Sequence, residues 1–394
     1  MAIRTLDELS LTGKRVFIRV DFNVPLDAEC RVTDDTRIRE AVPTIRFAVD
    51  KGAKVILASH LGRPKGKRVP EMSLAPAAAR LSELIGKPVK TVPDCIGPLA
   101  EQAVAELKPG DVLLLENLRF YKEEEKNDPA FAKSLAALAD VYVNDAFGAA
   151  HRAHASTEAM AGLVKEVAAG FLMQKEIRYL EGALKEPARP FVTILGGAKV
   201  SDKIGVVKNL LPKVNEMLIG GGMANTFLWA LGQQVGASKV ENDKGDEARS
   251  VIEQARAAGV GLLLPEDVVV AKEMKPEAQT RVVPVSGIPE NWLALDIGPK
   301  TVQKFCSRIR QAGTIVWNGP MGVFEMAPFS SGTREVARAI ADGGAVSIVG
   351  GGDSVAALEK EGVKDRITHV STGGGASLEY LEGKVLPGIK ALDR

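Results

Sequence analysis

The stretch FVTILGGAKVSDK, residues 191–203, decides the fold class of this sequence. Its first five residues are all apolar or β-branched, as expected of a strand buried on both faces, and Gly196 and Gly197 follow immediately. Short buried strands that alternate with helices are typical of a parallel, doubly wound α/β sheet. The rest of the chain repeats this pattern in both directions.

The repeats fall into two groups, with a break near residue 170. Before the break we expect strands at 15–20, 54–59, 111–115 and 141–143, and helices at 75–85 and 130–139. After it we expect strands at 191–195, 217–219, 261–264, 314–317, 346–349 and 369–371. An amphipathic helix over 168–184, ended by Pro187 and Pro190, is the expected junction. The sequence therefore predicts an α/β protein with two doubly wound parallel sheets.

Composition fits two globular domains and excludes several classes of partner. The chain has 394 residues, of which 45% are hydrophobic and 26% charged. A net charge of +1 and only 5% aromatic residues argue against nucleic acid or an anionic membrane as partner. Cys30, Cys95 and Cys306 lack metal or redox spacing and are expected to be reduced structural thiols. We find no leader and no apolar run of membrane-spanning length, so we expect a cytoplasmic protein.

Glycine is concentrated in the second half, where it follows the expected strands. Residues 171–394 hold 29 of the 39 glycines, including the clusters 196–197, 220–222, 350–352 and 373–375. Ligands of open α/β sheets bind beyond the carboxyl ends of the strands, where glycine lets backbone N–H groups approach an anion. We therefore expect a phosphate-rich ligand in the second half, with plain strand-to-helix turns as the alternative.

The common nucleotide motifs are nevertheless missing. Residues 62–68 are one residue too short for G-x-x-x-x-G-K-[ST] and carry Arg68 where the hydroxyl residue should stand. In G-x-G-x-x-G the last glycine is replaced by Asn225 after one cluster and by Val355 after another. The protein-kinase motifs are absent as well. A P-loop NTPase, a dinucleotide dehydrogenase and a protein kinase are therefore disfavoured.

The first half carries arginines and histidines on loops that follow expected strands. They are Arg19, Arg37, His60, Arg63, Arg119, His151, Arg152 and His154. Arginine binds carboxylate and phosphate groups in a bidentate manner, so Arg37, Arg63, Arg119 and Arg152 together indicate an anion-binding basin for a small acid. Solvated surface arginines are the alternative, and we expect that role for Arg39 and Arg46. Asp21 and Asn23 are candidates to bind a substrate hydroxyl, or else form an ordinary Asx turn before Pro25.

The second half supplies cations and carboxylates beside its glycine clusters. Lys199 and Lys203 are spaced to share one face of a helix opening at 198–200. Cations are unfavourable in the first turn of a helix because of the helix dipole, and a bound anion would offset that cost. Asp353 is a candidate ligand for Mg²⁺ carried by a nucleotide, with a helix N-cap formed by Asp353 or Ser354 as the alternative. Glu325 is a candidate partner for a ribose, or else a surface glutamate. No catalytic triad or zinc motif is visible, which leaves positioning and electrostatics, the needs of phosphoryl transfer.

Nine segments, in order along nearly the whole chain, resemble the phosphoglycerate kinase family. In the first half they are RVDFNVP (19–25), SHLGRP (59–64), ENLRF (116–120) and VNDAFG (143–148). In the second half they are LGGAKVSDK (195–203), GGGMAN (220–225), WNGPMGVFE (317–325), GGGDS (350–354) and STGGGA (371–376). One departure is Ala149, where many relatives are expected to have threonine.

The resemblance implies a reaction and a domain plan. It implies reversible phosphoryl transfer from 1,3-bisphosphoglycerate to ADP, giving 3-phosphoglycerate and ATP, with Mg²⁺. It also implies a monomer of two Rossmann-like domains separated by a cleft that closes for in-line transfer. Their expected bounds are 1–169 with a C-terminal return at 377–394 for phosphoglycerate, and 170–376 for the nucleotide. Helix 168–184 and the return near Ser377 are the expected hinges.

The resemblance also implies roles for individual residues. The residues expected to hold phosphoglycerate are Asp21, Asn23, Arg37, His60, Arg63, Arg119 and Arg152. The residues expected to hold the nucleotide are Lys203, Gly298, Asn318, Pro320, Glu325, Gly351, Gly352, Asp353 and Ser354, with Asp353 meeting the metal. Arg37, Lys199, Gly373 and Gly374 are the expected catalytic donors around the transferring group. Two other hypotheses remain open: an acid-sugar kinase of another lineage, and a non-catalytic metabolite-binding scaffold.

Overall fold

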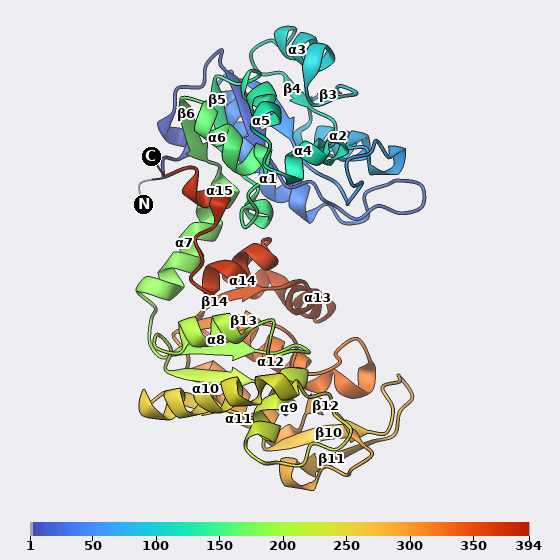
Figure 1. The fold of residues 1–394 in the computed structure, drawn as a ribbon, viewed down its shortest axis with the longest axis vertical. Helices are drawn as coiled ribbons and strands as arrows, with labels where there is room; N and C mark the ends of the chain where they lie inside the picture. Colours follow the sequence, from blue (N-terminus) through green and yellow to red (C-terminus); the bar gives the residue numbers. More distant parts are fainter. Residues whose placement is uncertain (1–2, 394) are drawn as a thin grey trace. The chain divides into compact units, whose positions relative to one another are not determined.

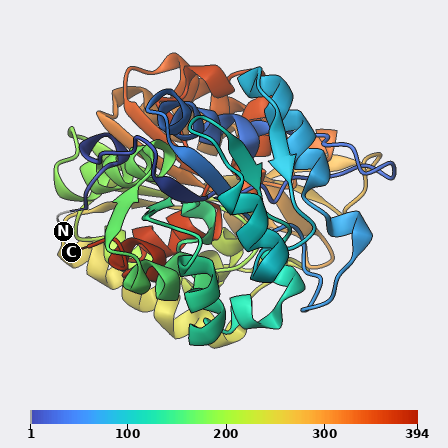
Figure 2. The same cartoon turned by 90° about the horizontal axis from the view of Figure 1, so that it is seen from above.

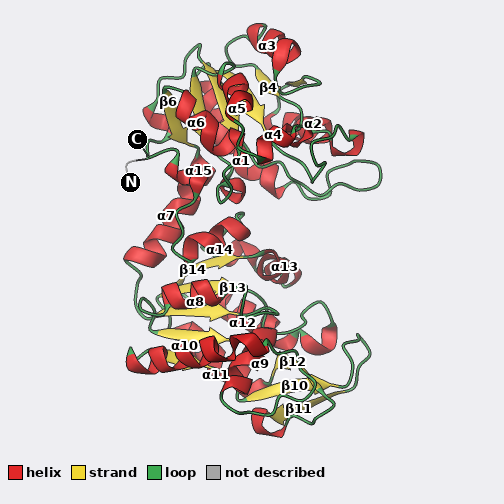
Figure 3. Cartoon of the chain, in the orientation of Figure 1, coloured by secondary structure: helices red, strands yellow, loops and turns green. Residues whose placement is uncertain are grey.

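The chain folds into two compact units, each built on its own six-stranded sheet (Figures 1 and 3). The computed structural model describes residues 3–393. The first unit comprises the described residues up to Arg178 and those from Val385 onward, and the second is Tyr179–Lys384. We expected the chain to pass from one domain to the other at 169/170 and back at 376/377. In the structure the first boundary lies inside helix α7 (Phe171–Lys185), and the second follows helix α14 (Gly375–Leu381).

The first unit has a wholly parallel sheet in the order β3-β4-β2-β1-β5-β6. Its strands are β1 Arg15–Arg19, β2 Lys54–Ala58, β3 Val89–Thr91, β4 Val112–Leu114, β5 Val141–Asn144 and β6 Glu166–Ala169. Its helices are α1 Thr36–Asp50, α2 Ala75–Ile85, α3 Gly97–Ala105, α4 Lys122–Glu125, α5 Pro129–Ala136, α6 Met160–Leu163 and α15 Pro387–Lys390, with the start of α7. The central strands read as unbroken apolar runs because both faces of a parallel sheet are covered.

The second unit repeats the plan, with the parallel order β15-β14-β13-β7-β8-β9. Its strands are β7 Phe191–Leu195, β8 Glu216–Ile219, β9 Gly261–Leu263, β13 Thr314–Asn318, β14 Val346–Gly350 and β15 His369–Val370. Its helices, besides α14 and the rest of α7, are α8 Ile204–Leu210, α9 Gly221–Ala230, α10 Gly245–Ala257, α11 Pro299–Gln311, α12 Ser331–Asp342 and α13 Gly352–Lys360. The predicted α/β class with two parallel sheets is confirmed.

A small antiparallel sheet in the second unit was not predicted. Strands β10 (Asp267–Ala271), β11 (Thr280–Pro284) and β12 (Leu293–Ile297) pair in the order β11-β10-β12. Strand β11 is mostly exposed, and its last residue is Pro284, which has no N–H to donate. Strand β11 therefore lacks the buried run and the terminal glycine by which other strands of this unit are recognised, whereas β10 is largely buried.

The expected junction helix begins later than predicted. Residues 166–169 form β6, in which Val167 pairs with Tyr142 and Ala169 with Asn144 of β5, so these residues belong to the sheet. The carboxylate of Asp145 then accepts hydrogen bonds from the backbone N–H groups of Leu172, at 2.9 Å, and Met173, at 3.1 Å, which fixes the start of α7.

Segments near the two ends of the chain meet in the first unit. Ile3 forms an antiparallel bridge with Asp393, and Figures 1 and 2 both place the first and last described segments side by side. Asn144 Nδ2 donates to the carbonyl oxygen of Gly388 at 3.3 Å, and Gly388 N donates to that of Ala150 at 2.9 Å. Within residues 3–393 no helix combines the length and the apolar character needed to cross a membrane.

Candidate active site

Each sheet has a topological switch point beside its first strand. The chain first adds strands on one side of that strand and later adds strands on its other side. In the first unit this point lies between β1 and β5, and in the second between β7 and β13. Ligands of open α/β sheets bind beyond the carboxyl ends of strands at such points. The residues that follow these strands are therefore the first candidates for a site in each unit.

In the first unit, the loops after β1 and β2 are joined by the predicted site residues. Arg37 Nη1, in the first turn of α1, lies 2.8 Å from Asp21 Oδ2. The N–H of Gly62 donates to Asn23 Oδ1 at 2.9 Å, and Arg119 Nη1 donates to the carbonyl oxygen of Gly62 at 2.8 Å. Asp21 Oδ1 also accepts from Asn23 N at 3.2 Å, so the Asx turn that we considered as the alternative is present as well.

His60 is buried within this group and is held by a second arginine. Arg19, which has no exposed surface, places its Nη2 3.1 Å from His60 Nδ1. Burial lowers the pKa of His60 well below its usual value, with Arg19 and Arg119 adding to the effect, so the ring is neutral near pH 7. Burial alone would raise the pKa of Asp21, but the charged and polar groups around it, His60, Arg37 and Arg19, lower it, and the carboxyl group is ionised.

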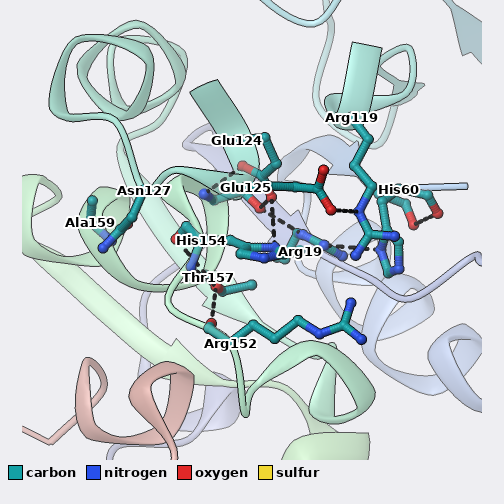
Figure 4. A network of polar contacts seen from close by, with 12 residues as sticks. Arg19, His60, Arg119, Glu124, Glu125, Asn127, Arg152, His154, Thr157 and Ala159 are labelled. Carbon is teal, nitrogen blue, oxygen red and sulfur yellow. Dashed lines mark hydrogen bonds and ion pairs between the residues drawn. The ribbon is translucent and has the colours of Figure 1, made fainter. Parts of the chain in front are cut away.

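Arg119 and Arg152 come from other segments and approach the same place (Figure 4). Each lies close enough to His154 to help lower its pKa to about 3, after the larger effect of burial. Arg152 Nε donates to His151 Nε2 at 3.2 Å, and Arg119 Nε lies 3.4 Å from Glu125 Oε1. Burial also lowers the pKa of Arg119, and the charges of Arg152 and Arg19 act in the same direction. The positive charges of the basin thus repel one another, which an anionic ligand would relieve.

Arg63 completes the predicted set at the rim. It is exposed, next to Gly62, whose N–H and carbonyl groups hold Asn23 and Arg119. The structure therefore brings Asp21, Asn23, Arg37, His60, Arg119 and Arg152 into one connected group, with Arg63 beside it.

In the second unit, the expected helix face shared by Lys199 and Lys203 does not exist. Helix α8 begins only at Ile204, with Lys203 at its N-cap and Lys199 exposed in the turns before it. Gly196 and Gly197 leave the chain in an open turn with a positive φ of 102° at Gly197, so residues 198–203 form turns rather than helix. Lys203 is instead buried, and its Nζ donates to the carbonyl oxygens of Gly196, at 2.6 Å, and Asn318, at 2.8 Å.

Lys203 therefore ties the loop after β7 to the loop after β13, at the switch point. Burial lowers its pKa to about 8, partly offset by the carboxylates of Asp353 and Asp202. The amine is charged at neutral pH, but burial without a full counter-charge weakens its hold on the proton, and a bound anion would stabilise the charged form.

The glycine clusters are needed for close approach of backbone to backbone. A Cβ at Gly196 would lie 2.1 Å from the carbonyl oxygen of Pro320, and one at Gly221 would lie 2.7 Å from Gly197 N. Gly221 also has a positive φ of 66°. No side chain fits between these loops, so their backbone groups form a continuous wall.

A cavity of about 270 Å³ opens along this wall. One side is backbone from the glycine loops and α9, and the other is β12 with the loop after β13. Its lining residues are Gly197, Ala198, Gly221, Gly222, Asn225, Ser238, Lys239, Met274, Leu293, Ala294, Leu295, Pro320, Gly322, Val323, Glu325 and Asp353. Apolar walls with a few polar groups are typical of a pocket for a small molecule.

Three predicted nucleotide residues, Pro320, Glu325 and Asp353, line this cavity. Asp353 is exposed in the first turn of α13, whose N-cap is Gly351 with a positive φ of 92°, so neither Asp353 nor Ser354 is the cap we considered. The Ser354 hydroxyl accepts from Gly319 N at 2.7 Å, and Asn318 Nδ2 donates to the carbonyl oxygen of Gly350 at 3.0 Å. These two side chains join the loops after β13 and β14.

Gly298, which we expected to line the pocket, is not among the residues that line this cavity. It is the N-cap of α11, packed so closely on Asp267 that a Cβ would lie 2.3 Å from the carboxyl carbon. The cavity wall is formed by Leu293, Ala294 and Leu295, earlier in β12. The antiparallel sheet that carries this wall was not predicted, and for that reason its residues were missed along with Ser238, Lys239 and Met274.

Gly373 and Gly374 lie after β15, at the same end of the second sheet. Gly373 N donates to Ser371 Oγ at 3.1 Å, and Gly374 is the N-cap of α14 with a positive φ of 46°. Two further residues were missed in the first unit, Glu124 and Ser156, which stand behind Arg19. Nothing in the sequence singles them out: Glu124 lies in the charged run 122–126, and Ser156 lies between Ala155 and Thr157.

Comparison with known proteins gives one answer along the whole chain. The family model described as phosphoglycerate kinase matches residues 6–384. The curated phosphoglycerate kinase of Moorella thermoacetica is 61% identical over 100% of this chain and 99% of its own length, and the cytosolic one of Nicotiana tabacum is 58% identical over 100% and 98%. The solved phosphoglycerate kinase structure from Coxiella burnetii matches with a TM-score of 0.91 and 44% identity, covering 99% of each chain. Because sequence, fold and site motifs agree over the full length, the chain belongs to the phosphoglycerate kinase family.

Proposed function

We propose that this chain transfers a phosphoryl group reversibly between the acyl phosphate of 1,3-bisphosphoglycerate and ADP, with one substrate on each unit. The observation that carries the proposal is the pair of switch points: one bears a cationic basin, the other a backbone-lined cavity. In the forward direction the bond from phosphorus to the carboxyl oxygen breaks and a bond to a β-phosphate oxygen of ADP forms. The products are 3-phosphoglycerate, which leaves as a carboxylate, and ATP.

The basin of the first unit is assigned to phosphoglycerate. Arg63, Arg119 and Arg152 are placed to bind its phosphate, because guanidinium groups pair with phosphate oxygens in a bidentate manner. His60, Asp21 and Asn23 are the polar groups for its carboxyl and hydroxyl oxygens. No general base is required, because the acceptor in the reverse direction is already an ionised carboxylate.

The cavity of the second unit is assigned to the nucleotide. Its apolar wall of Leu293, Ala294 and Leu295 suits an adenine ring, and Glu325 is a partner for the ribose hydroxyls. Lys203, with the backbone N–H groups at Gly351, Gly352 and Ser354, is assigned to the phosphates, as at other helix N-termini that bind anions.

Asp353 fits a magnesium ion that arrives with the nucleotide. It is exposed, lies on the cavity and is near enough to Lys203 to raise that amine's pKa. Mg²⁺ usually binds phosphate oxygens and water with only one or two protein carboxylates, so a cage of several acidic residues is not needed. The ion would neutralise charge on the phosphates while Asp353 orients it.

Arg37, Lys199 and the N–H groups of Gly373 and Gly374 are proposed to surround the transferring group. Arg37 belongs to the first unit and the other three to the second, so transfer in line requires the units to close on each other. Closure excludes water, which would otherwise accept the phosphoryl group, and directs fixed positive charge at the equatorial oxygens. Helix α7 and the segment between α14 and α15, where the chain passes between units, are the proposed hinges.

We also propose that the enzyme works as a monomer in the cytoplasm. The tobacco relative is named as cytosolic, which supports the compartment.

A coupled assay with 3-phosphoglycerate and MgATP tests the reaction, and calorimetry tests the division of sites. We expect turnover, and we expect 3-phosphoglycerate and MgADP to bind without competing. Arg63→Ala should weaken binding of 3-phosphoglycerate alone, and Glu325→Ala binding of MgADP alone. Turnover with a different acid and none with 3-phosphoglycerate would favour the kinase of another lineage; binding of both ligands without turnover would favour the metabolite-binding scaffold.

A further inference from the structure

A buried polar chain behind the basin ends at His60, and its other members have no part in the assignments above (Figure 4). It begins at Glu124, in α4, which has no exposed surface. Glu124 accepts from the backbone N–H of Ser156 at 3.0 Å and from the Ser156 hydroxyl at 2.6 Å. Ser156 Oγ in turn lies 2.8 Å from Arg19 Nε, and Arg19 Nη2 lies 3.1 Å from His60 Nδ1.

The direction of every hydrogen bond in this chain follows from the arginine. A guanidinium group only donates, so Ser156 Oγ and His60 Nδ1 must both accept from Arg19. The single hydroxyl proton of Ser156 is then directed to Glu124. Because His60 is neutral and its Nδ1 is an acceptor, its one ring proton must lie on Nε2.

The burial of these groups makes the arrangement rigid. Arg19, Ser156 and Glu124 are all inaccessible to solvent, so none of them exchanges its partner for water at low cost. The other arms of Arg19 and Ser156 are also held: Arg19 Nη1 donates to the carbonyl oxygen of Val20, and Tyr142 Oη donates to that of Ser156 at 2.8 Å. Burial raises the pKa of the Glu124 carboxyl group, and the charge of Arg19 and the hydrogen bonds from Ser156 partly offset this effect.

We propose that Glu124 and Ser156 are positioning residues which, through Arg19, fix His60 as the Nε2–H tautomer and so present a neutral N–H donor to phosphoglycerate. A neutral N–H group can donate a hydrogen bond to an oxygen of the acid. It adds no further positive charge to a basin whose cations already repel one another. The proposal rests on the assignment of the basin to phosphoglycerate, but the tautomer itself is a property of the free protein.

The first test is the ¹⁵N spectrum of the histidine rings in the ligand-free wild-type protein. The chain has four histidines, and the signals of His60 are identified by their loss in His60→Gln. We expect the Nε2–H pattern for His60 throughout pH 6 to 8. An Nδ1–H tautomer, or protonation of the ring within that range, would overturn the proposal without any variant.

The second test compares Ser156→Ala with Tyr142→Phe as the matched control. Each variant removes one buried hydroxyl group: that of Ser156 itself, or that of Tyr142, which donates to the Ser156 carbonyl oxygen. Only Ser156→Ala deprives Arg19 Nε of its acceptor. We expect Ser156→Ala to mix the two tautomers of His60 and to raise the KM for 3-phosphoglycerate about tenfold, with the KM for MgATP unchanged. Tyr142→Phe should lower the melting temperature and leave the tautomer and both KM values unchanged.

The outcomes separate this proposal from the assignment of the basin. A folded Ser156→Ala that keeps the Nε2–H form and the wild-type KM refutes the role of Ser156 and Glu124. Should His60→Gln and Arg63→Ala bind 3-phosphoglycerate as tightly as the wild type, the basin assignment fails, whatever the tautomer. Glu124→Gln, which keeps the shape but loses the charge, should act in the same direction as Ser156→Ala.

Discussion

At the scale of single residues, Arg37 differs from Arg39 although both begin the same helix. Arg37 faces the basin and pairs with Asp21, whereas Arg39 is exposed and pairs with Asp35 on the helix itself. We expect Arg37→Ala to lower kcat on the order of 100-fold, because we propose that its cation stabilises charge that develops in the transition state. Arg39→Ala is the control and should keep kcat within about twofold, since exposed pairs contribute little. Steady-state kinetics with a melting curve for each variant checks this; an Arg37→Ala protein with nearly full kcat would remove Arg37 from the mechanism.

Lys203 predicts a pH dependence of nucleotide binding. Its folded-state pKa is lowered to about 8 by burial, so the amine loses its charge as pH rises through 8. Binding of MgADP should therefore weaken above that pH, by up to about tenfold per pH unit. The lowered pKa of Lys203 has the opposite effect on folding stability. Between pH 8 and 10.5 this amine is protonated in the unfolded chain but not in the folded protein, so its contribution to the free energy of unfolding rises with pH in that range.

Calorimetric titration with MgADP from pH 6.5 to 9.5 measures this dependence. Lys203→Met is the matched comparison, because it keeps a long buried side chain without the titrating group. Its affinity should be lower overall, and the step near pH 8 should be missing. A step of equal size in both proteins would assign the titration to another group.

At the scale of elements, the N-terminus of α9 is part of the nucleotide cavity, and its glycines test how closely the loops must approach. Gly221 and Gly232 both have a positive φ, of 66° and 84°. A Cβ at Gly221 would meet Gly197 and Pro320, whereas one at Gly232 would meet nothing within 4 Å. We expect Gly221→Ala to weaken MgADP binding about tenfold or more, and Gly232→Ala to cost only backbone strain and leave binding unchanged. Calorimetric titration of both variants with MgADP checks this. Equal losses of affinity would show that backbone strain, and not the contact of the new Cβ with the neighbouring loops, weakens binding.

The start of α7 gives a second comparison of two glycines. A Cβ at Gly170 would lie 2.3 Å from Asp145 Oδ1, the oxygen that accepts from Leu172 and Met173. Gly170→Ala should therefore lower stability by about 2 kcal/mol or more, through overpacking and loss of this cap. Gly162→Ala, in α6 with open space around it, should be neutral or slightly stabilising. Scanning calorimetry of the two variants decides, and equal melting temperatures would contradict the role of Asp145.

The elements also show why some features were predictable and others were not. Buried strands such as β7 and β13 were found because a parallel strand leaves an apolar run with glycine behind it. Strands β10 to β12 were not found. Strand β11 is mostly exposed and gives no buried run, whereas β10 has a buried apolar run and β12 is followed by Gly298, so these two strands carried signals that we did not use. Gly298 was assigned to the pocket by the family resemblance alone; in the structure it packs on Asp267 and is not among the residues that line the cavity.

Among site residues, the predictable ones are those whose chemistry is visible alone. Arg37, Arg63, Arg119 and Arg152 were grouped from charge and loop position. In the structure Arg119 bonds to Gly62, next to Arg63, and lies near enough to Arg152 for the two charges to interact. Lys203 was placed on a helix face by spacing, but the spacing does not show that Gly197 opens the chain into turns. Glu124 and Ser156 were missed because a buried partner acts through tertiary contacts that no local pattern records.

At the scale of the whole molecule, the proposed transfer between sites on two separate units predicts a change of shape. We expect the radius of gyration from X-ray scattering to fall when 3-phosphoglycerate and MgADP, which do not react with each other, are both bound. Each ligand alone should change it less, because only the pair brings together the groups that surround the transferring phosphoryl. Full occupancy of both sites, shown by calorimetry under the same conditions, with an unchanged radius would contradict closure.

The return of residues 385–393 to the first unit sets the order in which the protein is completed on the ribosome. Gly388 closes over Ala150 and Asn144, next to the loop that carries Arg152. These residues follow the second unit along the chain, so a nascent chain has every segment of its second unit before it has this piece of its first. The first unit, although most of it is synthesised earlier, is therefore completed later, and a chain that lacks residues 385–393 would have a whole second unit beside an unfinished first unit.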